Sequence, residues 1–144
     1  MIRKYGFRLG LLSILVLGGI YISLHKEDVF NTQKTSATAA MTAENLISYV
    51  TTDKGQYLAT LVDQVIAVEG VIKEINYVNQ RHTILLGGGQ EDLALVICDM
   101  QTDQAKKTGF LKQGDTVVLK GVFKGFLQDA VFLNCVLTAN QKRP

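Results

Sequence analysis

The segment VIAVEGVIKEI, from Val65 to Ile75, is rich in β-branched residues and predicts a long strand. Gly70 lies in its middle, where a glycine indicates a bend or a β-bulge. A second segment, TVVLKGVF from Thr116 to Phe123, repeats this arrangement around Gly121. Two long strands that each contain a glycine break are typical of a small and strongly curved barrel.

Three further strands are predicted between and after these two. They are HTILL (His82–Leu86), LALVICD (Leu93–Asp99) and AVFLNCVL (Ala130–Leu137). QTDQAKKTG, from Gln101 to Gly109, predicts a short helix that ends at its glycine. Upstream, Thr42 is placed to cap a helix, and a second short helix follows Gly55.

Five strands with a helix between the third and the fourth predict a mainly β fold. We expect a five-stranded OB-fold-like Greek-key barrel with short N-terminal helices, preceded by a single transmembrane helix. The alternative is another small α+β domain with a meandering sheet. The predicted domain boundaries are a membrane anchor over residues 1–25, a polar linker over 26–41, the barrel domain over 42–140 and a tail over 141–144.

The anchor is predicted from sixteen residues without charge, LGLLSILVLGGIYISL from Leu9 to Leu24. As a helix they span roughly 24 Å, and the hydrocarbon core is about 30 Å thick. The flank Arg3, Lys4 and Arg8 favours a cytoplasmic N-terminus, which places the C-terminal domain outside the cytoplasm. A cleaved signal peptide is the alternative, although no Ala-x-Ala-like site closes the apolar run.

The charge of the chain is divided unevenly. Three of the 15 basic residues precede the apolar run and all 13 acidic residues follow it, so the remainder carries 12 basic against 13 acidic groups, a net charge of −1. A domain that binds several phosphates usually has an excess of basic residues. This balance disfavours tight binding of nucleic acid.

Four sequence motifs resemble those of the tRNA_anti-like family of OB-fold proteins. They are VEGVI (68–72), VIC (96–98), GDTVVLKG (114–121) and LNCVL (133–137), within a likeness that covers roughly residues 43–138. The resemblance implies an OB fold in a short bacterial protein that is exported or held at a membrane. The family name records a likeness to anticodon-binding OB domains, and the family implies no catalytic residues.

No catalytic or metal-binding pattern is found in the sequence. The chain has two histidines, and His82 is the only one in the predicted domain. Cys98 and Cys135 match no zinc-binding spacing, and the Gly87–Gly89 run lacks the Lys-Ser/Thr of a phosphate loop. We therefore expect a protein that is not an enzyme and has no cofactor and no metal site.

OB folds bind ligands across the face of their second and third strands, between the first–second and fourth–fifth loops. Tyr77 and Arg81 lie at the first of these loops, and Lys124 and Phe126 at the other. An aromatic ring and a cation on each side are suited to stack on and hold a base, a sugar or a peptide. The alternatives are ordinary solvated surface for the cations and a cap on the barrel for Phe126.

Cys98 and Cys135 are predicted to meet, because the third and fifth strands of an OB barrel are neighbours. Export makes a disulfide between them feasible. Two buried free thiols are the alternative.

The predicted function is a membrane-tethered extracytoplasmic binding module of unknown ligand. Its partners are the membrane and an unidentified protein or ligand of the cell envelope. The alternative is a protein that binds single-stranded nucleic acid or an oligosaccharide, although the charge balance disfavours nucleic acid.

Overall fold

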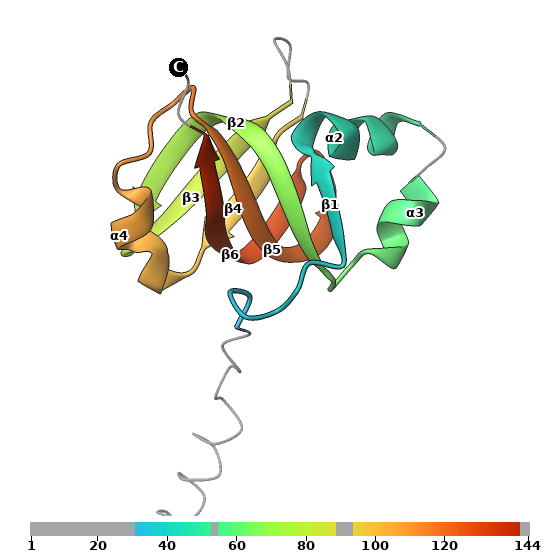
Figure 1. The fold of residues 1–144 in the computed structure, drawn as a ribbon. Helices are drawn as coiled ribbons and strands as arrows, with labels where there is room; N and C mark the ends of the chain where they lie inside the picture. The colour runs from blue at the N-terminus through green and yellow to red at the C-terminus, as the bar shows by residue number, and fades with distance from the viewer. Residues whose placement is uncertain (1–30, 53–54, 89–93, 142–144) are drawn as a thin grey trace, which may run out of the picture. The chain divides into compact units, whose positions relative to one another are not determined.

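A computed structural model describes residues 31–52, 55–88 and 94–141. The described residues belong to one compact unit. In chain order its elements are β1 (Ala39–Thr42), α2 (Ala43–Thr51), α3 (Gly55–Thr60), β2 (Val65–Val78), β3 (Arg81–Gly87), β4 (Val96–Met100), a 3-10 turn (Thr102–Gln104), α4 (Ala105–Thr108), β5 (Thr116–Phe126) and β6 (Ala130–Gln141). Helix α4 lies at one end of the barrel, and α2 and α3 lie at the other (Figure 1).

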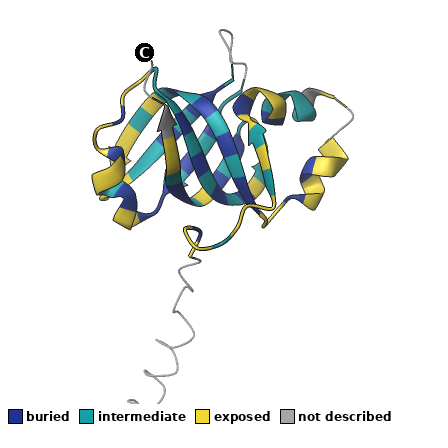
Figure 2. Ribbon diagram, viewed as in Figure 1, coloured by how far each residue is buried: buried dark blue, intermediate teal, exposed yellow. Residues whose placement is uncertain are grey.

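Five of the strands close into a barrel. Strand order β2-β3-β4-β6-β5 returns to β2 through the β2–β5 pairing. The β4–β6 pairing is parallel, and the other four pairings around the ring are antiparallel. The predicted mainly β, five-stranded OB-type barrel with a helix between its third and fourth strands is therefore confirmed. Figure 2 shows buried and partly exposed residues alternating along these strands, as a barrel with a packed interior requires.

The two glycines in the long strands lie at points of close approach. A Cβ atom at Gly121 would lie 2.5 Å from Sγ of Cys135, and the β5–β6 register shifts between Lys120 and Val122. The predicted irregularity at Gly121 is thus confirmed. At Gly70 an added Cβ would lie 3.0 Å from Cβ of Leu86, but the register of β2 with β3 shifts later, between Ile72 and Glu74. The bulge in β2 is therefore at Lys73, three residues after the glycine at which a bend or bulge was predicted.

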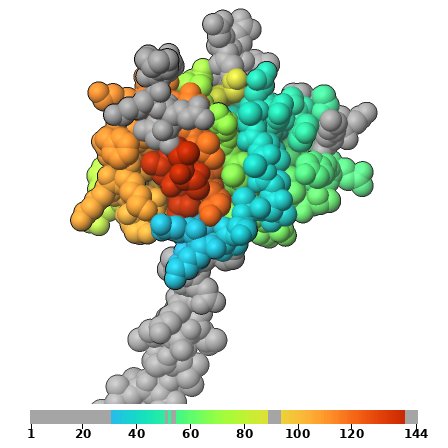
Figure 3. All heavy atoms as spheres, in the orientation of Figure 1, coloured from blue at the N-terminus to red at the C-terminus, as the bar shows by residue number. Residues whose placement is uncertain are grey.

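The domain begins before Thr42. Strand β1 pairs in parallel with β2 and lies in the stretch for which the sequence predicts a linker. It occupies the edge of β2 that β3 leaves free, because β3 pairs only with β2 residues from Val71 onward. The segment that precedes β1 is also held on the barrel. Its carbonyl oxygens at Gln33 and Thr35 accept hydrogen bonds from Nζ of Lys120, at 3.2 Å and 2.9 Å. Figure 3 shows this segment in blue, packed on the barrel surface.

The predicted cap of the first helix is confirmed. The backbone N–H of Asn45 donates to Oγ1 of Thr42 at 3.2 Å. Leu46 of α2 is fully buried, so this helix packs on the barrel through one side.

The predicted transmembrane helix, within residues 1–25, lies outside the described residues. Within residues 31–52, 55–88 and 94–141, no helix has the length and apolar character needed to cross a membrane.

Candidate functional site

The outward side of strands β3, β4 and β6 carries a row of apolar side chains with polar residues at one end. We name this surface the barrel face; its apolar members are Leu85, Ile97, Val131 and Leu133, and its polar members are Thr83 and Asp99. Their neighbours along each strand, such as Ile84, Cys98 and Phe132, are buried, so alternation directs the barrel-face residues away from the core. Leu85 pairs with Ile97, and Ile97 pairs with Val131, so the row runs across three strands.

An ion pair closes one end of the barrel face. Nη2 of Arg81 lies 3.2 Å from Oδ2 of Asp99, and the two side chains are 43% and 26% exposed. The β2–β3 turn sets this position, because Asn79 and Gln80 both have positive φ and Val78 pairs with Arg81. The charge of the predicted ligand residue Arg81 is thus neutralised by a carboxylate of the protein itself.

Tyr77 lies on the other side of the same hairpin. It pairs with His82, and the two ring centroids are 4.7 Å apart. Since neighbouring residues on a strand point to opposite sides, Tyr77 and His82 lie opposite to Arg81. The structure therefore places the predicted ligand residues Tyr77 and Arg81 on different sides of the sheet.

His82 ties strand β3 to α4. Its Nδ1 lies 2.5 Å from Oγ1 of Thr108, whose own hydroxyl donates to the carbonyl oxygen of Gln104 at 3.0 Å. This contact holds the imidazole of His82 against α4.

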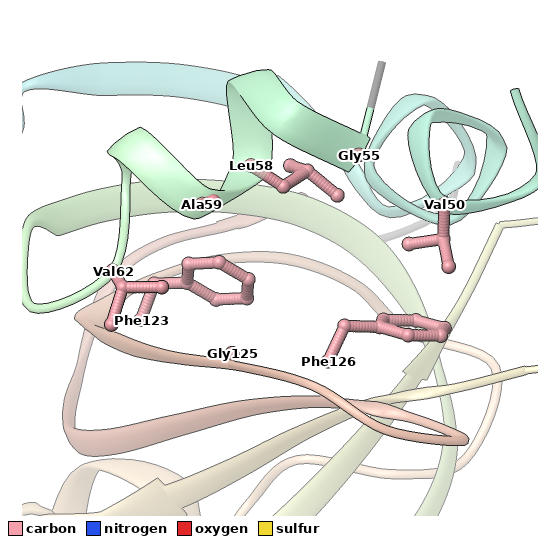
Figure 4. A pocket seen from close by; sticks show the side chains of 8 residues that line it. All are labelled: Val50, Gly55, Leu58, Ala59, Val62, Phe123, Gly125 and Phe126. Carbon is pink, nitrogen blue, oxygen red and sulfur yellow. The ribbon is translucent and has the colours of Figure 1, made fainter. Parts of the chain in front are cut away.

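The other end of the barrel face is the β5–β6 turn. Lys124, 44% exposed, forms an ion pair with Asp63, which precedes β2. Phe126 lines a hollow instead of the barrel face. Figure 4 shows it below Val50 of α2. Lys124 and Phe126 thus contact different parts of the protein, and the structure does not bring the four predicted ligand residues together.

The chemistry available at the barrel face is that of apolar contact. The cations at both of its ends are paired with carboxylates, and Leu85, Ile97 and Val131 between them carry no polar group. Binding to the phosphates of a nucleic acid relies on lysine and arginine side chains that are free to contact them. The sequence contained a signal for this row, because LALVICD is apolar on both of its alternating sides, but nothing in the sequence showed which side faces outward.

The two cysteines meet inside the barrel, as predicted. Both are buried, and the side chain of Cys98 is hydrogen-bonded to Cys135. Burial raises the pKa of the Cys135 thiol well above its usual value, and the contact with Cys98 raises it further. Both thiols are free in this structure, so the disulfide itself stays a prediction. Within the described ranges, no three His, Cys, Asp or Glu side chains are grouped closely enough to hold a metal ion.

Comparison with solved structures supports the fold. A lipoprotein from Klebsiella pneumoniae, described as a candidate nucleic-acid binder, superposes with a TM-score of 0.56 at 10% identity, over 68% of this chain and 91% of that one. The Stn1–Ten1 complex of S. pombe gives a TM-score of 0.40 at 13% identity, over 51% of this chain and 57% of that one. The likeness to the Klebsiella protein, at 10% identity, concerns the fold alone. No curated protein sequence matches the chain.

The family is shown by a match along most of the sequence. The family model described as tRNA_anti-like matches residues 3–137, which include the apolar N-terminal run and all but the end of β6. The resemblance noted from the short motifs is therefore confirmed, and the chain belongs to the tRNA_anti-like family.

Proposed function

We propose that this protein is a membrane-tethered, non-catalytic binding module whose barrel face captures an uncharged, largely apolar segment of a partner outside the cytoplasm. The observation that carries the proposal is the row formed by Leu85, Ile97 and Val131, with paired cations at both ends. Leu85, Ile97 and Val131 are partly exposed and Leu133 beside them is 37% exposed, and apolar side chains grouped at a surface are typical of an interaction site. It lies on the face that OB folds use for ligands.

The tether is supported by the N-terminal sequence. The uncharged run Leu9–Leu24 follows Arg3, Lys4 and Arg8, and the family match begins at residue 3 and so includes this run. The similar Klebsiella structure is described as that of a lipoprotein. A reporter fused after Pro144 that is active only outside the cytoplasm tests this topology. Activity of a reporter that works only in the cytoplasm would contradict it.

The proposal that the domain is not catalytic is supported by the contact that its one histidine makes. His82 is committed to Thr108 through Nδ1, and neither thiol is exposed. A nucleophile needs an accessible position and a base beside it. We therefore propose that the domain acts by binding alone.

Nucleic-acid binding is the second candidate, and one surface favours it. Lys106, Lys107 and Lys112 are exposed along and after α4, next to Phe110, which is 57% exposed. Tyr77, 60% exposed, is joined to the same end through His82. Aromatic rings among cations are the elements of a single-strand site.

Salt dependence separates the two candidates. The full chain in detergent is bound to a labelled single-stranded oligonucleotide and, separately, to solubilised envelope proteins, at low and high salt. The proposal predicts capture of an envelope component that survives high salt and is lost in Ile97→Lys. Salt-sensitive oligonucleotide binding that Ile97→Lys leaves intact and Lys107→Glu abolishes would replace it with the second candidate.

A further inference from the structure

The end of the barrel at α4 carries exposed cations and an exposed aromatic ring. Lys106, Lys107 and Lys112 are exposed, and Phe110, which lies between them in sequence, is 57% exposed. Figure 2 shows α4 largely in yellow, the colour of exposed residues, at the end of the barrel away from α2 and α3. We name these four residues the α4 patch.

A second aromatic ring extends the α4 patch. Tyr77, 60% exposed, packs against His82 with the ring centroids 4.7 Å apart, and His82 contacts Thr108 at the end of α4. Aromatic side chains are favoured at the boundary between water and hydrocarbon, and lysines are favoured beside anionic headgroups. Two exposed rings next to three cations therefore match the chemistry of a bilayer surface.

The lysines of the α4 patch are available to an external anion. Among the described residues none of them forms an ion pair, in contrast to the cations at both ends of the barrel face. The acidic residues of the same stretch accept hydrogen bonds from the protein itself. Asp103 accepts one from Nε2 of Gln104 at 3.2 Å, and Asp115 accepts one from the N–H of Lys112 at 2.9 Å. The patch thus has an excess of positive charge.

The sequence leaves little chain between the predicted anchor and the domain. Leu24 ends the uncharged run, and the compact unit begins at Asn31, seven positions later. Seven extended residues reach at most about 25 Å, less than the width of a domain whose radius of gyration is about 13 Å. The segment before β1 adds no slack, because Lys120 holds the carbonyl oxygens of Gln33 and Thr35. A short tether gives a high effective concentration, so a weak contact with the bilayer is populated.

We propose that the α4 patch docks on a membrane surface that contains anionic phospholipid, with its lysines beside the headgroups and Phe110 at the boundary with the hydrocarbon. The inference rests on the proposed tether. Each lysine at an anionic surface favours binding by about fivefold, so three favour it by about a hundredfold. Nucleic acid is the less favoured occupant, because three cations neutralise few phosphates and the chain beyond the apolar run has a net charge of −1.

The test measures whether position 110 enters a bilayer. The chain has no tryptophan, so Phe110→Trp introduces a single fluorescent reporter. The full chain is embedded in nanodiscs of phosphatidylcholine, with or without phosphatidylglycerol, whose lipids carry a shallow nitroxide quencher. Leu127→Trp is the matched control, because Leu127 is 95% exposed and follows Phe126, which lines a hollow with residues of α2 and α3 at the other end of the barrel.

In nanodiscs that contain phosphatidylglycerol, we expect the quenching in Phe110→Trp to be several times that in Leu127→Trp. It should fall to the control level in phosphatidylcholine alone. It should fall equally when Lys106→Gln, Lys107→Gln and Lys112→Gln are added to Phe110→Trp. These side chains are exposed, so the variants should melt within a few degrees of the wild type.

Equal quenching in Phe110→Trp and Leu127→Trp would overturn the proposal, as would quenching that phosphatidylglycerol does not raise. Emission from Phe110→Trp that responds to a single-stranded oligonucleotide and not to phosphatidylglycerol would assign the α4 patch to nucleic acid and refute the docking. A wild-type chain that enters nanodiscs of neither composition would refute the proposed tether and this inference with it. Entry without selective quenching at position 110 would refute the inference alone.

Discussion

Gly121 faces the thiol of Cys135, and substituting it tests how closely β5 and β6 approach. In Gly121→Ala the new Cβ would lie 2.5 Å from Sγ of Cys135 and 3.2 Å from the carbonyl oxygen of Leu133. Ordinary contact is near 3.5 Å, so the sulfur has to move by about 1 Å in a packed interior. Overpacking of this kind costs about 1–3 kcal/mol. For a domain of this size, a loss of about 2 kcal/mol lowers Tm by roughly 8 °C.

The partner substitution shows whether the sulfur causes the loss. Cys135→Ala alone removes one buried atom and is expected to cost about 1 kcal/mol. In the double variant the new methyl group enters the space that the sulfur leaves. The double variant should therefore lose about 1 kcal/mol less stability than the losses of the two single variants added together. Gly55→Ala is the control, since an added Cβ there has no neighbour within 4 Å.

The assay is urea unfolding of the full chain followed by circular dichroism, with thermal melting beside it. The reasoning is refuted if Gly121→Ala is as stable as Gly55→Ala. It is refuted equally if the loss in the double variant equals the sum of the two single losses to within about 0.5 kcal/mol, because independent sites are additive in that way.

Three further predictions concern single residues. The raised pKa of Cys135 means that the folded chain keeps its thiol proton at a pH where the unfolded chain releases it. The free energy of unfolding should therefore hold its value below the ordinary thiol pKa of 9.0 and decline as pH rises above it. The part of this decline that Cys135 causes should be absent in Cys135→Ala. Alkylation of the unreduced chain after unfolding is expected to modify both Cys98 and Cys135, which are free in the structure; two unlabelled cysteines would contradict this and show the disulfide instead. Thr42→Ala removes the acceptor of the Asn45 N–H and should lower the free energy of unfolding by about 1 kcal/mol in urea titrations, whereas Thr42→Ser should retain most of it.

The strands could be predicted because their residues carry the local signal. The segments that begin at Val65, Thr116 and Ala130 start where the structure starts β2, β5 and β6. Strand β1 escaped prediction because it has only four residues, AAMT, and two of them are alanines with little strand preference. Its place on the edge of β2 follows from tertiary pairing, which local sequence does not show.

The position of the candidate site could be predicted from the expected topology, but the direction of its side chains could not. Once five strands are expected to form an OB barrel, the loops beside the ligand face follow. The direction of each side chain depends on register, and the pairing of Val78 with Arg81 places Tyr77 on the opposite side. Lys124 meets Asp63 across 61 residues of sequence, a contact that no local pattern indicates.

Site-specific photo-crosslinking in living cells tests the central claim most directly. A photoreactive amino acid replaces Ile97 on the barrel face, and in a matched chain it replaces Val78, which is exposed in the β2–β3 hairpin. The account predicts a defined protein adduct from position 97 that is absent from position 78 and is lost when Leu85→Lys is added. The same adducts from both positions, or adducts at position 97 that contain nucleic acid, would contradict it.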